Sequence, residues 1–207
     1  HAEEVARERL SYLTFSGTDK ETATTIAGYF KTTYINTVIN KDIYGVQYAS
    51  ILKNINSVGS GIAHGLEYGD NFLSVLIANS ADEMASFLRK SGVKNIEVGH
   101  TEHQETVNEH RPINYAASVY LGDLLVTCYS LHSRNRSFGN MIGKGYAVKA
   151  AQLEMRMVAE GYNASKCMFT INQTIKADMP IATTIYKILW ENLPVAEGFN
   201  EIEATLV

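Results

Sequence analysis

The fold of this chain is decided between Asp42 and Leu66, where the sequence reads DIYGVQYASILKNINSVGSGIAHGL. Apolar residues recur there at steps of four, three, four and four, at Ile51, Ile55, Val58, Ile62 and Leu66. That spacing places them on one face of a helix, and an Asp at its start is a favourable N-cap. We therefore predict one long helix that begins at Asp42 and buries a single stripe.

More helices are predicted downstream. Asp70 is expected to cap a second helix, which Gly92 ends and whose inward face carries Leu73, Leu76, Ile77, Ser80, Met84, Phe87 and Leu88. Residues 93–112 are polar and lack a sustained period, which predicts a long loop. Additional helices are expected near 114–128, 133–144, 147–157, 163–177 and 180–192, the last begun by Pro180.

The first forty residues have a different character. Residues 11–16 and 34–39 are rich in β-favouring side chains, and between them Thr18 or Asp19 can cap a short helix. A sheet of two strands is marginal alone, so we expect this segment to belong to a larger sheet and to expose an unpaired strand edge. The predicted fold is mainly α, with an all-helical domain at residues 41–207 preceded by a βαβ-like remnant at residues 1–40.

Composition limits the classes of function. The 207 residues carry 18 Lys and Arg against 22 Asp and Glu, a net charge of −4, which gives no general reason to expect nucleic acid as a partner. No apolar run approaches the roughly 20 residues that a membrane-spanning helix needs. Two cysteines, Cys128 and Cys167, make no disulfide framework, so the cytoplasm is the expected compartment and both are expected to be small core residues.

Lys53 lies in an unusual setting on the long helix. Its neighbours on the face opposite the apolar stripe are small (Ser50, Ser57 and Ser60), and Gly45, Gly59 and Gly61 open the backbone further. Glycine in a helix interior costs about 1 kcal/mol relative to Ala, which suggests close approach by another helix or by a ligand. The alternative is a solvated Lys on an exposed face.

Asp123 and Thr127 are four residues apart and so share one face of a predicted helix. In its apolar frame, Asp123 is either a cap exposed at a turn or a buried carboxylate that needs a cation. Lys53 is an available partner. A Lys held by an Asp and a hydroxyl is a sensible proton donor to a carbonyl oxygen.

The run Ser133-Arg134-Asn135-Arg136 begins a helix with a good N-cap. Free amides and a guanidinium at a helix start suit an anion such as phosphate; the alternative is a simple cap with two surface arginines. A second cluster, His100, His103 and His110 among Glu102, Glu105 and Glu109, matches no zinc template, so no metal is expected. Trp190 is expected to pack in the core.

These segments together resemble the C-terminal part of NAD(P)-dependent glycerol-3-phosphate dehydrogenase. The resemblance is carried by Asp42-Ile43-Tyr44-Gly45-Val46-Gln47, Leu52-Lys53-Asn54, Gly61-Ile62-Ala63-His64-Gly65-Leu66, Gly122-Asp123-Leu124 with Thr127-Cys128, Ser133-Arg134-Asn135-Arg136-Ser137-Phe138-Gly139 and Val158-Ala159-Glu160-Gly161-Tyr162. It covers essentially the whole chain, and the ordered set is more specific than any single motif. Residues 1–40 would then be the last piece of a Rossmann-type cofactor domain.

The resemblance implies a reaction and a set of residues. The family reduces dihydroxyacetone phosphate to sn-glycerol 3-phosphate with NADH or NADPH, which supplies the backbone of phospholipids. Lys53 would be the acid/base residue, with Asp123 and Thr127 around it. Substrate would be bound by Lys53, Asn54, Asp123, Ser133, Arg134 and Asn135, and the NAD or NADP cofactor would be contacted by Arg134, Val158 and Glu160.

The chain departs from the family pattern in three places. Tyr120 stands where the family usually has Gly, the polar stretch at residues 93–112 differs, and no Gly-x-Gly-x-x-Gly loop follows a strand. Because it opens at His1, the chain is expected to be a piece of a longer polypeptide, inactive without the missing N-terminal Rossmann domain. Its expected partners are that domain and a small phosphorylated substrate, with a homodimer as an option.

Two alternatives to this function stay open. One is a non-catalytic helical module that binds an anion or a partner helix through the glycine-rich face. The other is a dehydrogenase of another small keto substrate.

Overall fold

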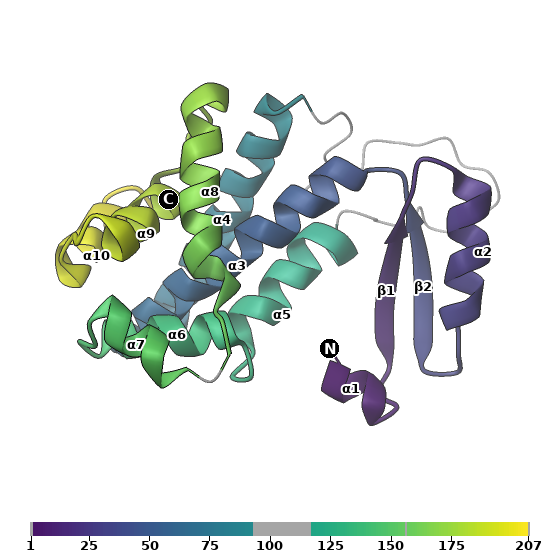
Figure 1. Cartoon of the computed structure of the whole chain (residues 1–207), viewed down its shortest axis with the longest axis horizontal. Helices are drawn as coiled ribbons and strands as arrows, with labels where there is room; N and C mark the ends of the chain where they lie inside the picture. Colours follow the sequence, from purple (N-terminus) through teal and green to yellow (C-terminus); the bar gives the residue numbers. More distant parts are fainter. Residues whose placement is uncertain (1, 93–116, 156, 207) are drawn as a thin grey trace.

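The computed structural model describes residues 2–92, 117–155 and 157–206, and it shows a small α/β unit beside a larger helical body (Figure 1). The α/β unit contains α1 (Ala2–Ala6), β1 (Ser11–Ser16), α2 (Lys20–Phe30) and β2 (Ile35–Asn40). The helical body contains α3 (Ile43–Gly65), α4 (Asp70–Lys90), the π-helix η1 (Ala117–Gly122), α5 (Asp123–Tyr129), α6 (Arg134–Gly143), α7 (Val148–Glu154), α8 (Glu160–Ile175), α9 (Pro180–Trp190) and α10 (Val195–Glu203).

The α/β unit contains one strand–helix–strand segment, as predicted. β1 and β2 pair in parallel, with Ser11 opposite Ile35 and Ser16 opposite Asn40. Helix α2 makes the crossover, and of the two candidate caps Asp19 is the one used: its carboxylate accepts from the Thr22 amide at 2.7 Å. Within the described residues the sheet consists of these two strands.

Helix α3 is the centre of the helical body. Asp42 caps it as predicted, accepting from the Gly45 amide at 2.7 Å. The stripe expected on one face is only part of what is buried, because the helix is enclosed all round from Ile55 to Ala63. The opposite face is therefore not solvated: Ser57 and Ser60 are 0% and 1% exposed.

Glycines let α3 and α6 approach each other backbone to backbone. A Cβ added to Gly61 would lie 2.1 Å from the Arg136 carbonyl oxygen, and one added to Gly139 would lie 2.0 Å from the Val58 carbonyl oxygen. Gly65 and Gly143 make a similar contact one turn later. For Gly61 the predicted close approach is therefore made by another helix, α6. A Cβ added to Gly59 would instead meet the Ile185 side chain of α9 at 2.6 Å, and one added to Gly45 would meet the Asp42 cap.

Several helix limits differ from those predicted. Asp70 is the first residue of α4 rather than its cap, which is Gly69. Of the helix expected at 114–128, the described part begins as a π-helix at Ala117 and becomes α-helical at Asp123. Helix α7 ends early, at Glu154, and α8 begins early, at Glu160. Helix α10 was not predicted from the sequence.

A buried carboxylate joins α4 to α9. Glu83 of α4 accepts from the main-chain amides of Ile181 and Ala182, and so caps α9, whose own N-cap residue Met179 contributes no side-chain bond. Burial raises the pKa of Glu83 to about 8, although the two amides act in the opposite direction.

The core predictions for the cysteines and Trp190 have mixed outcomes. Cys128 is fully buried, but Cys167 is exposed, so its prediction was wrong. Trp190 stacks on Tyr162 with ring centroids 4.2 Å apart and donates to the Tyr162 carbonyl, which confirms its packing role.

Candidate functional site

The structure brings Lys53 and Asp123 together. The Lys53 Nζ lies 2.5 Å from Asp123 Oδ2, and the two side chains are 17% and 27% exposed. Asp123 is the first α-helical residue after the π-helix η1, which runs directly into α5. Of the two alternatives for Asp123, a carboxylate paired with a cation is therefore the one observed. The contact holds the largely buried Lys53 ammonium against Asp123 Oδ2.

Thr127 lies one turn after Asp123, but its hydroxyl is used locally. Its Oγ1 donates to the Asp123 carbonyl at 2.6 Å, within α5. Its own carbonyl accepts from the Ser57 hydroxyl of α3 at 2.9 Å. The bond that the structure gives the Thr127 hydroxyl is thus to main chain rather than to the Lys53 ammonium.

The start of α6 lies next to this pair. Ser133 is its N-cap, as predicted, and accepts from the Arg136 amide at 3.3 Å. The amides of Arg134 and Asn135 have no acceptor among the described residues, as is usual for a first helical turn. They are available to an anion.

The two arginines of this run have different environments. Arg134 is 42% exposed and its Nη2 pairs with Glu160 Oε1 at 2.7 Å. Arg136 is buried, with Nη1 donating to the Tyr129 carbonyl at 3.0 Å. The alternative of two surface arginines is therefore wrong for Arg136, which holds the end of α5 instead.

Asn135 links three elements from a buried position. Its Nδ2 donates to Asn54 Oδ1 at 3.1 Å, and its Oδ1 accepts from the Gly161 amide at 2.9 Å. Asn54 directly follows Lys53, and Gly161 directly follows Glu160. The side-chain amide of Asn135 thus holds the start of α6 against both α3, which carries Lys53, and the start of α8.

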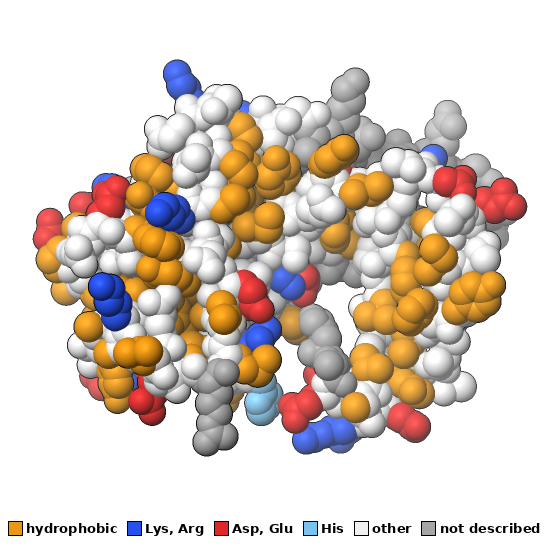
Figure 2. Space-filling view, viewed as in Figure 1, with side chains coloured by type: hydrophobic (Ala, Val, Ile, Leu, Met, Phe, Trp, Pro, Cys, Tyr) orange, Lys and Arg blue, Asp and Glu red, His pale blue; other side chains and the backbone are white. Residues whose placement is uncertain are grey.

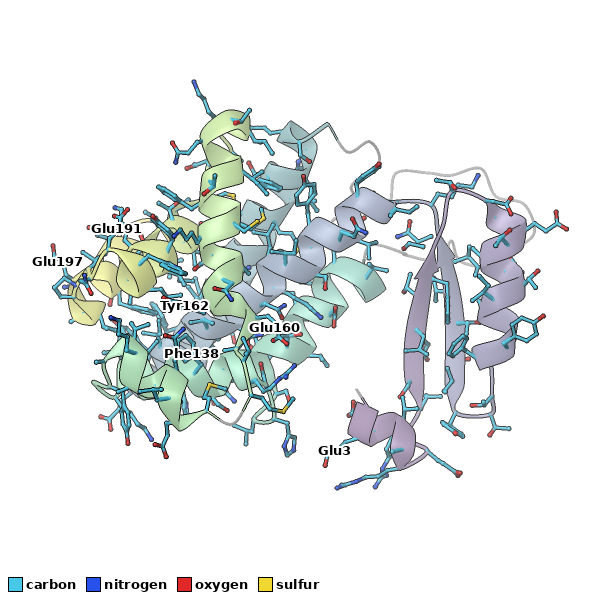
Figure 3. All side chains as sticks on the ribbon, viewed as in Figure 1. Glu3, Phe138, Glu160, Tyr162, Glu191 and Glu197 are labelled. Carbon is cyan, nitrogen blue, oxygen red and sulfur yellow. The ribbon has the colours of Figure 1, made fainter. Side chains whose placement is uncertain are left out.

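The three residues expected at a cofactor lie on one exposed edge. Glu160, which Figure 3 labels at the start of α8, pairs with Arg134, and the Arg134 Nη1 lies 3.9 Å from the Met157 sulfur. Val158 comes just before α8 and is 67% exposed. A guanidinium beside exposed apolar side chains is thus presented to the outside of the helical body.

Tyr120 fills the place where a small residue was expected. It is buried, and its hydroxyl donates to Asp42, the N-cap of α3. Burial and the neighbouring Asp42 carboxylate both raise the pKa of this phenol. From the sequence, Tyr120 was noted only as a departure from the family's Gly and Ser57 only as a small neighbour of Lys53, so neither was predicted to be a functional residue. The one available signal for Ser57 was that it follows Lys53 by one helical turn.

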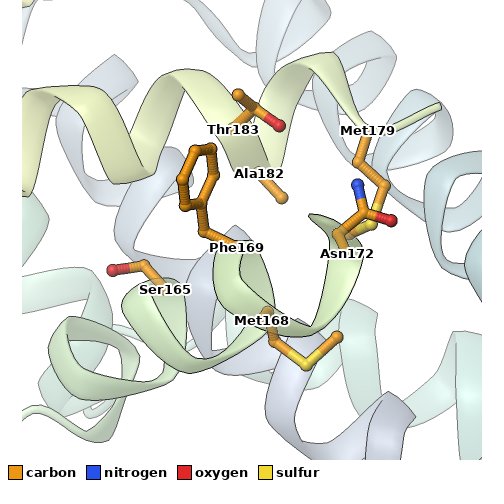
Figure 4. A pocket seen from close by; sticks show the side chains of 7 residues that line it. All are labelled: Ser165, Met168, Phe169, Asn172, Met179, Ala182 and Thr183. Carbon is orange, nitrogen blue, oxygen red and sulfur yellow. The ribbon is translucent and has the colours of Figure 1, made fainter. Parts of the chain in front are cut away.

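The surface has two hollows that could form a site. Figure 2 shows an indentation between the helical body and the β1–β2 unit, with acidic and basic side chains on its helical wall. A second hollow, between α8 and α9, holds no charged side chain; Ser165, Met168, Phe169, Asn172, Met179, Ala182 and Thr183 line it (Figure 4). The first is the candidate site, because acidic and basic side chains line its helical wall and none lines the second.

Two other expectations concern metal and membrane. The described residues contain no group of three or more His, Cys, Asp or Glu that could hold a metal ion. His100, His103 and His110 lie outside the described residues. None of the described helices is both long enough and apolar enough to span a membrane.

Comparison with known proteins gives consistent matches over the whole chain. A family model described as the C-terminus of NAD-dependent glycerol-3-phosphate dehydrogenase matches residues 42–200. A glycerol-3-phosphate dehydrogenase (NAD(P)+) of Chlorobium phaeobacteroides is 32% identical over 98% of this chain and 55% of the relative. That of Lacticaseibacillus paracasei is 33% identical, over 98% and 53%. The chain therefore spans about half the length of the curated relatives it matches.

Solved structures share the fold. A glycerol-3-phosphate dehydrogenase from Coxiella burnetii superposes with a TM-score of 0.84 at 24% identity, over 98% of this chain and 57% of that one. One from Plasmodium falciparum gives 0.80 at 19% identity, over 100% and 55%. At these identities the likeness concerns the fold.

Proposed function

The chain belongs to the family of C-terminal domains of NAD-dependent glycerol-3-phosphate dehydrogenase, and on that premise we propose that it provides the substrate side of this reaction. The proposed chemistry is the reversible, NAD(P)H-dependent reduction of dihydroxyacetone phosphate to sn-glycerol 3-phosphate. The observation that carries the proposal is the Lys53–Asp123 pair, with its 2.5 Å contact, beside the start of α6.

In this proposal Lys53 handles the proton. Its ammonium donates to the carbonyl oxygen during reduction and takes the proton back during oxidation of the alcohol. Asp123 aims the ammonium, because its Oδ2 lies 2.5 Å from the Lys53 Nζ. Thr127 contributes through the main chain of α5, whose first residue is Asp123.

The phosphate is proposed to bind at the start of α6. The first-turn amides and the Arg134 guanidinium supply donors with the geometry that phosphate oxygens accept. Asn54 and Asn135 hold that helix start against Lys53, and Ser133 caps it. The two ends of the substrate are thus held by different helices, α3 and α6.

The exposed edge formed by Arg134, Val158 and Glu160 fits a dinucleotide. A half-exposed guanidinium suits its phosphates, and the apolar surface of Val158 and Met157 suits a flat ring. The nicotinamide, when bound, supplies the hydride that reaches the carbonyl carbon. We propose that the chain works with a Rossmann-type cofactor domain, since its own sequence holds no Gly-x-Gly-x-x-Gly loop after a strand, and that these 207 residues alone are inactive.

The test is turnover by the full-length polypeptide that carries these residues. We expect NADH or NADPH to be oxidised on addition of dihydroxyacetone phosphate, and Lys53→Met to lower kcat about 10²- to 10⁴-fold. Lys20→Met, at an exposed position on α2, is the matched control and should leave the rate unchanged. No turnover with either cofactor would refute the proposal.

A second measurement separates the phosphate role from the rest. Arg134→Ala should raise KM for dihydroxyacetone phosphate more than it lowers kcat, because Arg134 is proposed to bind the phosphate. With dihydroxyacetone, which lacks the phosphate, the same variant should differ little from the wild type. An unchanged KM for the phosphorylated substrate would show that the phosphate lies elsewhere.

A further inference from the structure

Ser57 is a fully buried hydroxyl at the meeting point of three helices. It lies on α3, one turn after Lys53. Its Oγ is 2.9 Å from the Thr127 carbonyl oxygen of α5 and 2.9 Å from the Ser133 Oγ at the cap of α6. One small side chain therefore contacts the helix of Asp123 and the helix of Arg134 from the helix of Lys53.

The direction of these hydrogen bonds follows from counting protons. A carbonyl oxygen only accepts, so the single hydroxyl proton of Ser57 goes to Thr127. Ser133 must then donate its own proton to Ser57, and its oxygen accepts from the Arg136 amide at 3.3 Å. The result is one directed chain, from the first turn of α6 through both hydroxyls to the last turn of α5.

The directed chain decides what Ser133 can do. Its proton is committed to Ser57, and its main-chain amide donates to the Ser130 carbonyl at 3.2 Å. In this arrangement Ser133 has no donor left for a phosphate. Its contribution to an anion site is to hold the start of α6 in place, through Ser57.

We propose that Ser57 is a positioning residue that sets the spacing between the proton-donating end and the phosphate-binding end of the site. This inference rests on the proposed function. Thr127 is one turn from Asp123, and Ser133 directly precedes Arg134. The hydroxyl of Ser57 therefore connects the residues proposed to bind the carbonyl end of the substrate with those proposed to bind its phosphate.

Other contacts keep α5 and α6 together when Ser57 is changed. Arg136 still binds the Tyr129 carbonyl, and the glycine contacts between α3 and α6 do not involve the hydroxyl. The variant Ser57→Ala is therefore expected to fold, with a small displacement of the α6 start. Displacements of this kind act strongly on reactions that need both substrate ends held at once.

The experiment compares two substrates in the full-length polypeptide. Ser57→Ala is expected to lower kcat/KM for dihydroxyacetone phosphate about tenfold, and to change kcat/KM for dihydroxyacetone by less than about twofold, because only the phosphorylated substrate is held at both ends. Ser60→Ala is the matched control: Ser60 is as buried on the same helix, but its hydroxyl lies beside the Cys128 thiol. It should leave both values unchanged.

The outcomes separate this inference from the proposed function. If the wild type turns over dihydroxyacetone phosphate and Ser57→Ala loses equally on both substrates, or loses nothing, the positioning role is wrong. If the wild type shows no turnover, the proposed function itself fails. Should Ser57→Ala not fold, Ser57→Cys keeps the shape with a weaker donor and is expected to show the same preference between the substrates.

Discussion

Lys53 and Asp123 form an ion pair whose side chains are only 17% and 27% exposed, so removing either one changes the surroundings of the other charge. Removing one partner of such a pair leaves an uncompensated ion in a poorly hydrated place. Removing both partners leaves no uncompensated ion. The stability of the protein should therefore respond to the pair as a unit.

We predict non-additive effects in a double-mutant cycle. Asp123→Leu and Lys53→Met should each lower the free energy of unfolding by about 1–3 kcal/mol, and the double variant should lose less than the sum of the two. Urea denaturation at constant pH measures all four proteins. Additive losses would mean that the contact contributes no coupling energy.

Glu83 is the residue whose protonation should be visible in stability. Its pKa rises from an ordinary 4.5 to about 8 in the folded protein. Below the ordinary value both states are protonated; between the two values the native state binds more protons, so the free energy of unfolding should fall as pH rises, by at most about 1.4 kcal/mol per pH unit.

The check is urea denaturation of wild type and Glu83→Gln from pH 4.5 to 9. The Gln variant lacks this titration and should show a flatter curve across that window. Glu154→Gln, on the exposed end of α7, should follow the wild type. Parallel curves for wild type and Glu83→Gln would show that the carboxyl is already ionised throughout.

The contacts of single side chains were harder to predict from the sequence than the helices and strands. The sequence left two alternatives for Asp123, because a contact across 70 residues has no spacing that reveals it. The alternative that placed Arg136 on the surface was wrong. Most arginines at a helix start are exposed, and no sequence pattern reveals that the partner of Arg136 is a main-chain carbonyl. Ser57 was recorded only as small, and its hydroxyl acquires a role only once α5 and α6 are in place.

At the scale of elements, the crossing of α3 and α6 dominates the helical body. Its four glycines bring main chain against main chain, so a side chain added there has no flexible neighbour to displace. A similar contact is made by Gly161 of α8, whose added Cβ would lie 2.5 Å from the Asn54 carbonyl oxygen, but not every described glycine is constrained in this way. Gly28 of α2 has nothing within 4 Å of an added Cβ.

These two positions predict opposite effects of one substitution. Gly61→Ala should lower the free energy of unfolding by about 3 kcal/mol or more through overpacking. Gly28→Ala should raise it by up to about 1 kcal/mol, because Ala is the better helix former. Urea denaturation decides both; a Gly61→Ala variant as stable as the wild type would mean that the helices can separate freely.

The elements were predictable where a repeat was long. The α3 stripe and the α4 face were identified because apolar residues recur over several turns. Helix α10 was missed because it has only nine residues, with Gly198 inside it packed against Ile188. The π-helical start of the Asp123 helix has no periodic signal of its own.

At the scale of the whole molecule, a hydrogen bond from Tyr120 stabilises the junction between the α/β unit and the helical body. Its bond to Asp42 lies where the chain leaves β2 and enters α3. Tyr120 is also three residues before Asp123, on η1. The junction and the site residue are thus connected through one buried side chain.

Tyr120→Phe should loosen this junction. We expect the free energy of unfolding to fall by about 1–2 kcal/mol, and hydrogen exchange to accelerate at the first amides of α3. Tyr44→Phe, at a 72% exposed position on the same helix, is the control. Unchanged exchange at Gly45 and its neighbours would show that the phenol does not hold the junction.

The two-part architecture was visible in the sequence, because β-favouring residues stop near Asn40 and helical spacing begins at Asp42. What the sequence did not show is how the parts meet. Tyr120 stands where the family usually has Gly, and its phenol fills a buried place beside the α3 cap.

The contact between Lys53 and Asp123 closes a loop of 70 residues. The entropy of closing such a loop grows only with the logarithm of its length, so doubling the intervening chain would cost about 0.6 kcal/mol. Insertions and deletions between α4 and η1 should therefore be tolerated with little change in the pair itself. The same separation makes this a non-local contact, which forms slowly, so the chemistry of the chain should be assembled among the last steps of folding.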